Sequence, residues 1–187
     1  MKKILFLLIL TLVISTSKGQ VSFGNYTTFP DSKLFGLAYK PQLAIGKLND
    51  TYVLSLRYVS PEAYASFDEE SVLLLKFNTD TTIKLPIVKE IDVVKKYENS
   101  YSKYGTSHFY ITYSVYFLDD DVLNFLIDEN NAIKKIRASF TNGNVLDWEI
   151  KDNYQPKLTK GLITSYQQVE TLNAKRKEKI DDVEAGF

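Results

Sequence analysis

Hydrophobic and polar residues alternate with a period of two along much of the chain. In the longest such run, HFYITYSVYFL from His108 to Leu118, aromatic and β-branched residues predominate, as suits a half-buried strand. Its odd-numbered positions are the drier set, so we expect that face to point towards the core. Similar runs recur along the chain and predict a mainly antiparallel sheet of about seven to nine strands, curled or in two layers.

Two segments depart from this alternation and predict helices. Asp119–Asp121 precede VLNFLI, which offers an N-cap and early carboxylates for a short helix over Asp120 to Ile127. Near the C-terminus, apolar residues recur at three- and four-residue steps and predict an amphipathic helix over about residues 158–180: Leu158, Leu162, Tyr166, Val169 and Leu172. The tail from Lys175 is expected to fray in solvent. The fold class is therefore α+β.

Turn residues set the expected strand register. A two-residue turn at Asn49-Asp50 would place Leu43 and Ile45 opposite Leu56 and Leu54, and both turn residues tolerate the left-handed conformation that it needs. A three-residue loop at Asn78–Asp80 would likewise match Leu75 with Ile83 and Leu73 with Leu85.

The Asn142-Gly143 turn presents a choice of register. A two-residue loop would place Asp147 and Glu149 on the apolar face of the hairpin. A three-residue loop, Asn142–Asn144, would instead pair Ala138 with Trp148 and Ile136 with Ile150. A slip of one residue turns every side chain to the other face, so we expect hydrophobic matching to select the longer loop and to bury Trp148.

The N-terminus predicts export. Residues 1–19 have two lysines directly after Met1, then an apolar run and small polar residues, the pattern of a secretory signal peptide. The chain has no cysteine, which excludes a lipidated N-terminal cysteine. We expect a single domain over residues 20–187, beginning at Gln20 in a periplasmic or secreted protein, with no transmembrane segment after the signal is removed.

The charge balance argues against nucleic acid as a partner. Removal of the signal removes three lysines and no acid, which leaves 20 basic and 23 acidic residues and a net charge of −3. A dedicated nucleic-acid binder carries a marked excess of basic residues.

No catalytic residue, metal site or cofactor is predicted. His108 is the single histidine, and neither a GxSxG motif nor a cysteine nucleophile accompanies it. Asp119–Asp121 with Asp128 and Glu129 could hold calcium, which prefers oxygen ligands. Helix capping explains the first three acids more simply.

Three tyrosines form the candidate binding site. Tyr97, Tyr101 and Tyr104 have the spacing i, i+4, i+7 within an expected polar connection. On a helix they would share one face, and on a loop they could still cluster. With His108 they suit the rim of a partner-binding patch, because aromatic rings with polar edges favour recognition. The alternative is a lid that packs onto the sheet.

The order of segments also resembles a group of proteins. The segments DDDVLNFL, IKKIRASFTNG, LDWEIK and LTKGLITSYQQV follow an apolar strand. This arrangement resembles small exported β-rich proteins of unknown function from Gram-negative bacteria. The resemblance implies the same fold and location, and it implies no activity.

Three hypotheses for function follow. The first is a non-enzymatic binding or accessory protein of the cell envelope, with a protein or carbohydrate partner. The second is a carboxylate-based hydrolase that acts on glycans or cell-envelope polymers, which would need a concave site with two opposed carboxylates. The third is a structural partner in an envelope complex, which an exposed sheet edge or apolar patch would favour.

Overall fold

The structure, a computed structural model, describes residues 21–29, 41–60, 71–88, 94–102, 105–139 and 145–185. Within these ranges, only the backbone is described for residues 59–60, 94–110 and 180–185. The expected signal peptide and the expected loop Asn142–Asn144 lie outside the described residues.

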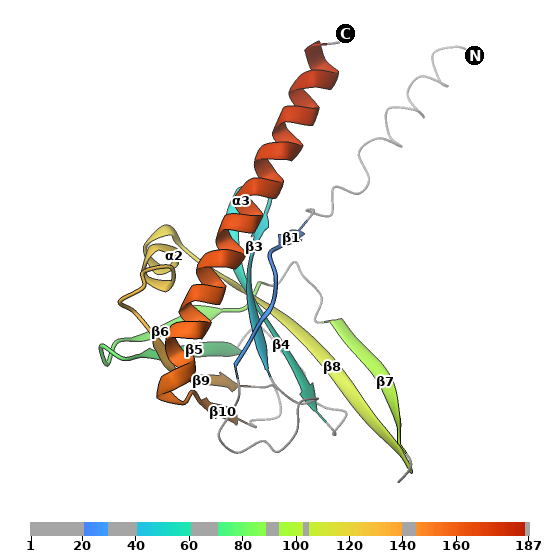
Figure 1. Cartoon of the computed structure of the whole chain (residues 1–187), viewed down its shortest axis with the longest axis vertical. Coiled ribbons are helices and arrows are strands. Elements are labelled where there is room, and N and C mark those ends of the chain that lie inside the picture. Colours follow the sequence, from blue (N-terminus) through green and yellow to red (C-terminus); the bar gives the residue numbers. More distant parts are fainter. Residues whose placement is uncertain are drawn as a thin grey trace, which may run out of the picture.

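Ten strands form two antiparallel sheets in this part of the chain (Figure 1). The six-stranded sheet has the order β1-β3-β4-β8-β7, with β2 also paired to β3. Its strands are β1 (Val21–Phe23), β2 (Thr27–Thr28), β3 (Gln42–Leu48), β4 (Thr51–Ser60), β7 (Val94–Ser102) and β8 (Gly105–Phe117). The four-stranded sheet has the order β10-β9-β5-β6. Its strands are β5 (Val72–Phe77), β6 (Thr82–Pro86), β9 (Ile133–Ser139) and β10 (Val145–Glu149). The expected α+β fold with mainly antiparallel sheets is confirmed.

Both expected helices are present. α2 (Asp120–Leu126) begins after Asp119, whose Oδ1 accepts a hydrogen bond of 2.7 Å from the backbone N–H of Val122. A 3₁₀ turn, η2 (Asp152–Tyr154), leads into α3 (Gln155–Ala185). The tail that we expected to fray continues α3, and its last turns extend beyond the strands (Figure 1). No helix in the described ranges is both long and apolar enough to cross a membrane.

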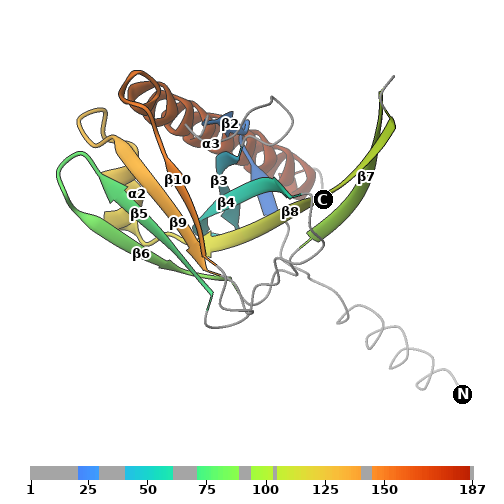
Figure 2. The ribbon, with the colours of Figure 1, turned by 90° about the horizontal axis from the view of Figure 1, so that it is seen from below.

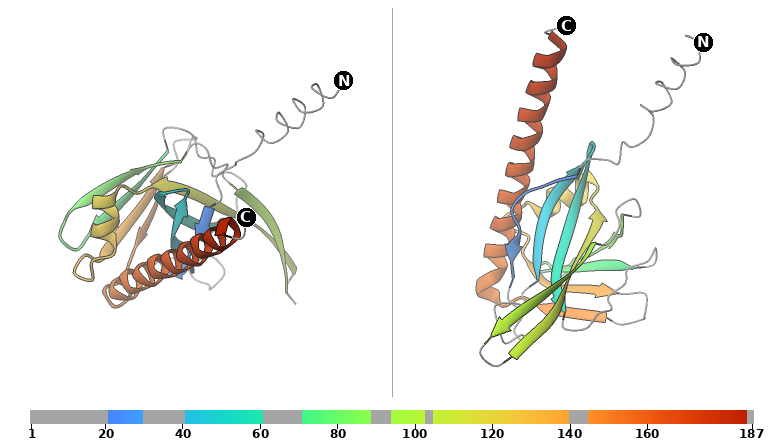
Figure 3. Two further views of the ribbon diagram at one scale, coloured as in Figure 1. Left: turned by 90° about the horizontal axis from the view of Figure 1, so that it is seen from above. Right: turned by 90° about the vertical axis from the view of Figure 1, so that its right-hand side faces the viewer.

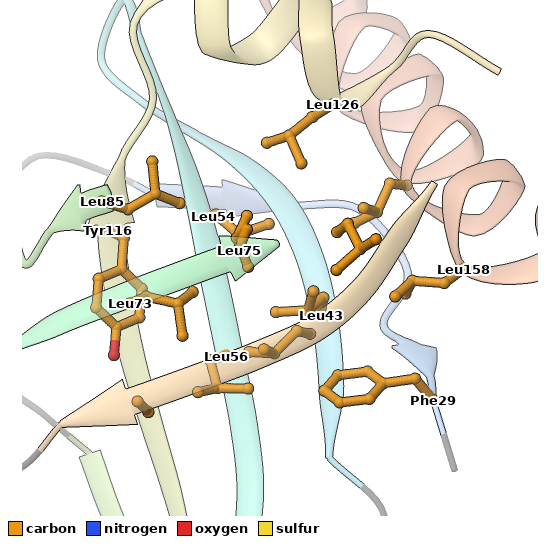
Figure 4. Packing of buried hydrophobic residues seen from close by; sticks show 14 of the residues in the cluster. Phe29, Leu43, Leu54, Leu56, Leu73, Leu75, Leu85, Tyr116, Leu126 and Leu158 are labelled. Atoms are coloured by element: carbon orange, nitrogen blue, oxygen red, sulfur yellow. The ribbon is translucent and has the colours of Figure 1, made fainter. Parts of the chain in front are cut away.

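The main core lies between the two sheets, whose strands run in crossing directions (Figure 3). Leu54 and Leu56 of β4 and Leu73 and Leu75 of β5 are fully buried there (Figure 4). The helices add buried leucines to the same cluster: Leu123 and Leu126 from α2, Leu158 and Leu162 from α3. Because full burial of one such side chain stabilises the fold by roughly 1.5–3 kcal/mol, this shared core dominates the stability.

Two turns have the register that we expected. Leu43 pairs with Leu56 and Ile45 with Leu54, and Asn49 has the left-handed φ of 53°. In the other hairpin Leu73 pairs with Leu85 and Leu75 with Ile83, and Asp80 has φ 61°. Asparagine and aspartate suit these positions because their short polar side chains reduce the cost of positive φ.

The register expected for the β9–β10 hairpin is wrong by two residues. Apolar residues do face one another, and Trp148 is buried, but Trp148 pairs with Ile136 and Leu146 with Ala138. Charge explains the shift. The expected register would have set Lys135 opposite Lys151, whereas the observed one sets it opposite Glu149, and like charges directly opposite are destabilising.

The expected core face of β8 is also wrong. Tyr116, on the even-numbered face, is fully buried in the main core. Val115, on the odd-numbered face, belongs to a smaller cluster with Val53 and Val88. The alternation could not decide the face because both faces of β8 are covered: Thr112 and Val115 are both buried.

The polar connection that we expected before His108 is a strand. β7 pairs with β8 along its whole length, from Val94 opposite Tyr113 to Ser102 opposite Gly105. It forms the edge of the six-stranded sheet, and the hairpin curves away from the other strands (Figure 2). Its polar sequence, VKKYENSYS, fits an edge strand, because charged residues there discourage pairing with other chains.

Candidate functional site

The predicted tyrosine site falls on the β7–β8 hairpin. Tyr97 pairs with Tyr110, and Tyr101 with Thr106, while His108 pairs with Asn99. Strand alternation therefore assigns positions 97, 101 and 108 to one face of the hairpin. Tyr104 lies outside the described residues, and only the backbone of the other three is described. The binding role of these four residues stays a prediction.

The acidic residues around α2 have structural roles. Asp119 caps the helix, and Oδ1 of Asp128 accepts a hydrogen bond of 2.9 Å from the backbone N–H of Asn130. Across the residues that the structure describes, no group of three His, Cys, Asp or Glu side chains could hold a metal ion.

A short N-terminal segment, Val21–Phe29, packs between β3 and α3 (Figure 3, right). Between β1 and β2 the edge of β3 is left to the helix. There the backbone N–H of Ile45 donates to Ser165 Oγ at 3.0 Å, and this hydroxyl donates to the carbonyl of Ile45 at 3.2 Å. Ser165 is fully buried. The Ser165 hydroxyl thus bonds both backbone groups of Ile45, whose carbonyl also accepts from the backbone N–H of Gly24 at 3.0 Å.

Two glycines permit this close packing. A Cβ on Gly24 would lie 2.2 Å from the carbonyl oxygen of Ser165, and a Cβ on Gly161 would lie 2.2 Å from Thr27 Oγ1. Glycine inside a helix costs about 1 kcal/mol relative to alanine. At Gly161 that cost is offset by the approach of the N-terminal segment.

A groove of about 400 Å³ runs between this segment and α3. We call it the α3 groove. Its lining residues are Phe23, Gly24, Asn25, Thr164, Gln167, Gln168, Thr171 and Leu172. None of these side chains is charged. The backbone N–H of Asn25 donates to Gln168 Oε1 at 2.7 Å, which joins the two walls, and Leu172 is 50% exposed at the groove.

A second cluster holds α3 against the β3–β4 hairpin. The Tyr52 hydroxyl donates to Glu170 Oε1 at 2.5 Å, and Lys47 Nζ lies 3.7 Å from the same oxygen. Burial and then the hydrogen bond to Glu170 raise the pKa of Tyr52, so its hydroxyl stays protonated at neutral pH. The ring of Tyr166 packs beside Tyr52 at 5.6 Å between centroids. The helix wall of the α3 groove is therefore held in place.

A smaller depression of about 250 Å³ lies on the outer face of the four-stranded sheet. Its lining residues are Leu74, Lys76, Thr82, Lys135 and Arg137. Most of this charge is already paired: Arg137 donates to both carboxylate oxygens of Asp147, at 2.6 and 2.7 Å, and Lys135 lies 3.3 Å from Asp147. The hydrogen bond from Arg137 is the main reason that the pKa of Asp147 is lowered to about 2.

The α3 groove was not predicted from the sequence. The amphipathic pattern identified the side of α3 that packs on the core. Apart from Leu172, the helix residues that line the groove lie outside that pattern. Two signals were available: Gly161 within a helical pattern, and the uncharged pair Gln167-Gln168 on a helix otherwise rich in lysine and glutamate.

Comparison with known proteins leaves the structure as the main guide to function. The chain matches no protein-family model, and a search of the curated proteins finds no significant relative.

Proposed function

We propose that the chain is an exported, non-catalytic binding protein of the cell envelope and that it binds a neutral carbohydrate in the α3 groove. The supporting observation is the lining of the groove, where amides and hydroxyls lie beside an aromatic ring and no side chain is charged. Amides and hydroxyls can exchange hydrogen bonds with sugar hydroxyls, and Phe23 offers an apolar surface for the face of a sugar ring.

The lining also bears on the alternative, a carboxylate-based hydrolase. Such an enzyme needs two carboxyl groups on opposite sides of the bond that it cleaves. The α3 groove contributes neither an aspartate nor a glutamate. Hydrolysis by carboxylates would therefore need a different site on this chain.

Export is part of the proposal. The signal-like segment ends at residue 19, and β1 begins at Val21. Strand pairing thus begins almost directly after the expected cleavage position. N-terminal sequencing of the protein recovered from the periplasm or the medium should find Gln20 first. Recovery of a cytoplasmic chain that still begins at Met1 would contradict export.

The binding experiment uses the chain from Gln20 and a panel of neutral oligosaccharides, followed by calorimetric titration of those that bind. The variant Gln167→Ala/Leu172→Ala removes two exposed groove side chains and should weaken binding about tenfold or more while leaving the melting temperature nearly unchanged. Thr82→Ala, on the outer face of the other sheet, is the matched control and should bind normally. Failure of every neutral glycan, or equal binding by both variants, would overturn the proposal.

A further inference from the structure

The outer face of the six-stranded sheet carries a half-buried arginine. Arg57 lies on β4 between Leu56 and Tyr58, which point into the main core, so strand alternation turns Arg57 to the opposite face. Its Nε donates to the Tyr113 hydroxyl at 3.2 Å, and its Nη1 donates to Gln42 Oε1 at 2.8 Å. Its guanidinium also lies 5.9 Å from the centroid of the Tyr113 ring. All of these partners are uncharged.

Arg57 has no ion pair with any residue that the structure describes. This is unusual, because a charge removed from water is normally matched by an opposite charge. The contrast with Arg137 is direct: that arginine is more exposed and makes two hydrogen bonds to a carboxylate. The less exposed of the two cations is therefore the one with no ion pair in the part of the chain that the structure describes.

The surrounding side chains hold the guanidinium in place. The amide of Gln42 is oriented by its own hydrogen bond, from Nε2 to Thr28 Oγ1 at 2.9 Å. The ring of Tyr113 packs edge-on against Tyr26 at 6.2 Å between centroids, and the Tyr26 hydroxyl lies 2.8 Å from the buried Ser55 Oγ. Burial is the largest cause of the raised pKa of Tyr26, so this neighbour adds no negative charge at neutral pH.

We propose that Arg57, Tyr113 and Gln42 form a binding site for a carboxylate, which we call the Arg57 site. A guanidinium has five N–H donors. Among the described residues, Tyr113 and Gln42 occupy two of them, which leaves three for a ligand. These donors can bind the two oxygens of a carboxylate side by side. The Tyr113 hydroxyl, which accepts from Arg57, can donate its own proton to the same ligand.

Charge favours a carboxylate over a phosphate. One guanidinium balances one negative charge, and the neighbours that hold it are neutral. A phosphate carries up to two charges near neutral pH and is usually met by several cations or by a helix N-terminus. The rings of Tyr26 and Tyr113 add an apolar surface, which suits a carboxylate attached to a carbon skeleton. The site is independent of the α3 groove.

The first test is a titration with sodium acetate at constant ionic strength, followed by the NMR signal of the Arg57 Nε–H group. We expect a saturable shift with acetate, none with chloride, and weaker binding of phosphate. Arg57→Lys keeps the charge but loses the planar pair of donors, so it should bind acetate about tenfold more weakly or worse, measured on neighbouring signals. Arg137→Gln is the matched control and should bind normally. A linear response to acetate, or tighter binding of phosphate, would overturn the assignment.

A second variant covers the case in which changes at Arg57 prevent folding. Gln42→Glu replaces the amide by a carboxylate of nearly the same shape, already 2.8 Å from the guanidinium. The new carboxylate should bind the Arg57 guanidinium in place of a ligand. This should raise the melting temperature and abolish the response to acetate. An unchanged response to acetate in this variant, or a lower melting temperature, would show that the guanidinium does not bind a carboxylate at this site.

Discussion

The two sheets share one core, but the cations on their outer faces have different partners. On the four-stranded sheet, Arg137 and Lys135 are matched by Asp147 on the neighbouring strand. On the six-stranded sheet, the partners of Arg57 among the described residues are Tyr113 and Gln42, both uncharged. On the first face, both Arg137 and Lys135 have an acid opposite them on the neighbouring strand, Asp147 and Glu149. Among the described residues no acid pairs with Arg57 on the second face, and we therefore propose a ligand carboxylate there.

Both sheets contribute to one core, so truncation of a core side chain should cause the largest loss of stability. Trp148 is buried on the inner face of β10, where its ring contacts Phe29 at 6.3 Å and Tyr58 at 6.1 Å between centroids. Because these partners belong to the other sheet and its N-terminal segment, Trp148→Ala should cost about 3–5 kcal/mol in chemical denaturation. Leu146→Ala, two residues away but 39% exposed, should cost less than half as much. Equal losses would show that the two sheets do not share one core at Trp148.

The inner face was the part most open to prediction from the sequence. Alternation of residues with a period of two identified the strands, and asparagine or aspartate at positive φ identified two turns. The same alternation could not fix the β9–β10 register, because any shift by two residues keeps Trp148 on the apolar face. There the choice depended on which charges meet across the strands, such as Lys135 and Glu149.

The candidate sites were beyond prediction for a different reason. Both depend on contacts between residues far apart in the chain, such as Asn25 with Gln168 and Gln42 with Arg57. No repeating pattern in the sequence indicates which distant residue a glycine or a glutamine will contact. Arg57 also interrupts an apolar strand in the same way as any outward-facing residue, so only the structure reveals that its partners among the described residues are uncharged.

Close packing against α3 is the second way to test the comparison, because the close approach at Gly161 is made by the N-terminal segment of the six-stranded sheet. In an exposed helix Gly161→Ala would stabilise the protein by up to about 1 kcal/mol. Here the added Cβ would lie 2.2 Å from Thr27 Oγ1. We therefore expect a loss of about 1–3 kcal/mol in denaturation experiments. Thr82→Val, a similar small change on the exposed face of the other sheet, should have almost no effect. A stabilised Gly161→Ala would mean that the N-terminal segment does not press on α3.

The smallest expected effect concerns the ion pairs of the four-stranded face. Asp147 has a folded-state pKa of about 2, below its ordinary value of 3.8. A lowered pKa means that the ionised carboxylate stabilises the fold above about pH 4, and that this contribution is lost as the pH falls through about 2. Asp147→Asn should therefore be less stable than the wild type near pH 6 and equally stable below pH 2. Because the pair is largely exposed, the difference near pH 6 should stay below about 1 kcal/mol.

Denaturation curves at several pH values and two salt concentrations measure this effect. High salt should reduce the difference near pH 6, because solvent ions screen exposed pairs. Asp50→Asn removes an exposed carboxylate that has no ion pair within the described residues, and it is the control for the loss of one surface carboxylate. If Asp147→Asn matches the wild type at every pH, the ion pairs do not stabilise the four-stranded face. Arg137 and Arg57 would then differ only in burial. In that case the acetate titration would be the only test of the Arg57 site, because the comparison of ion pairs would no longer support it.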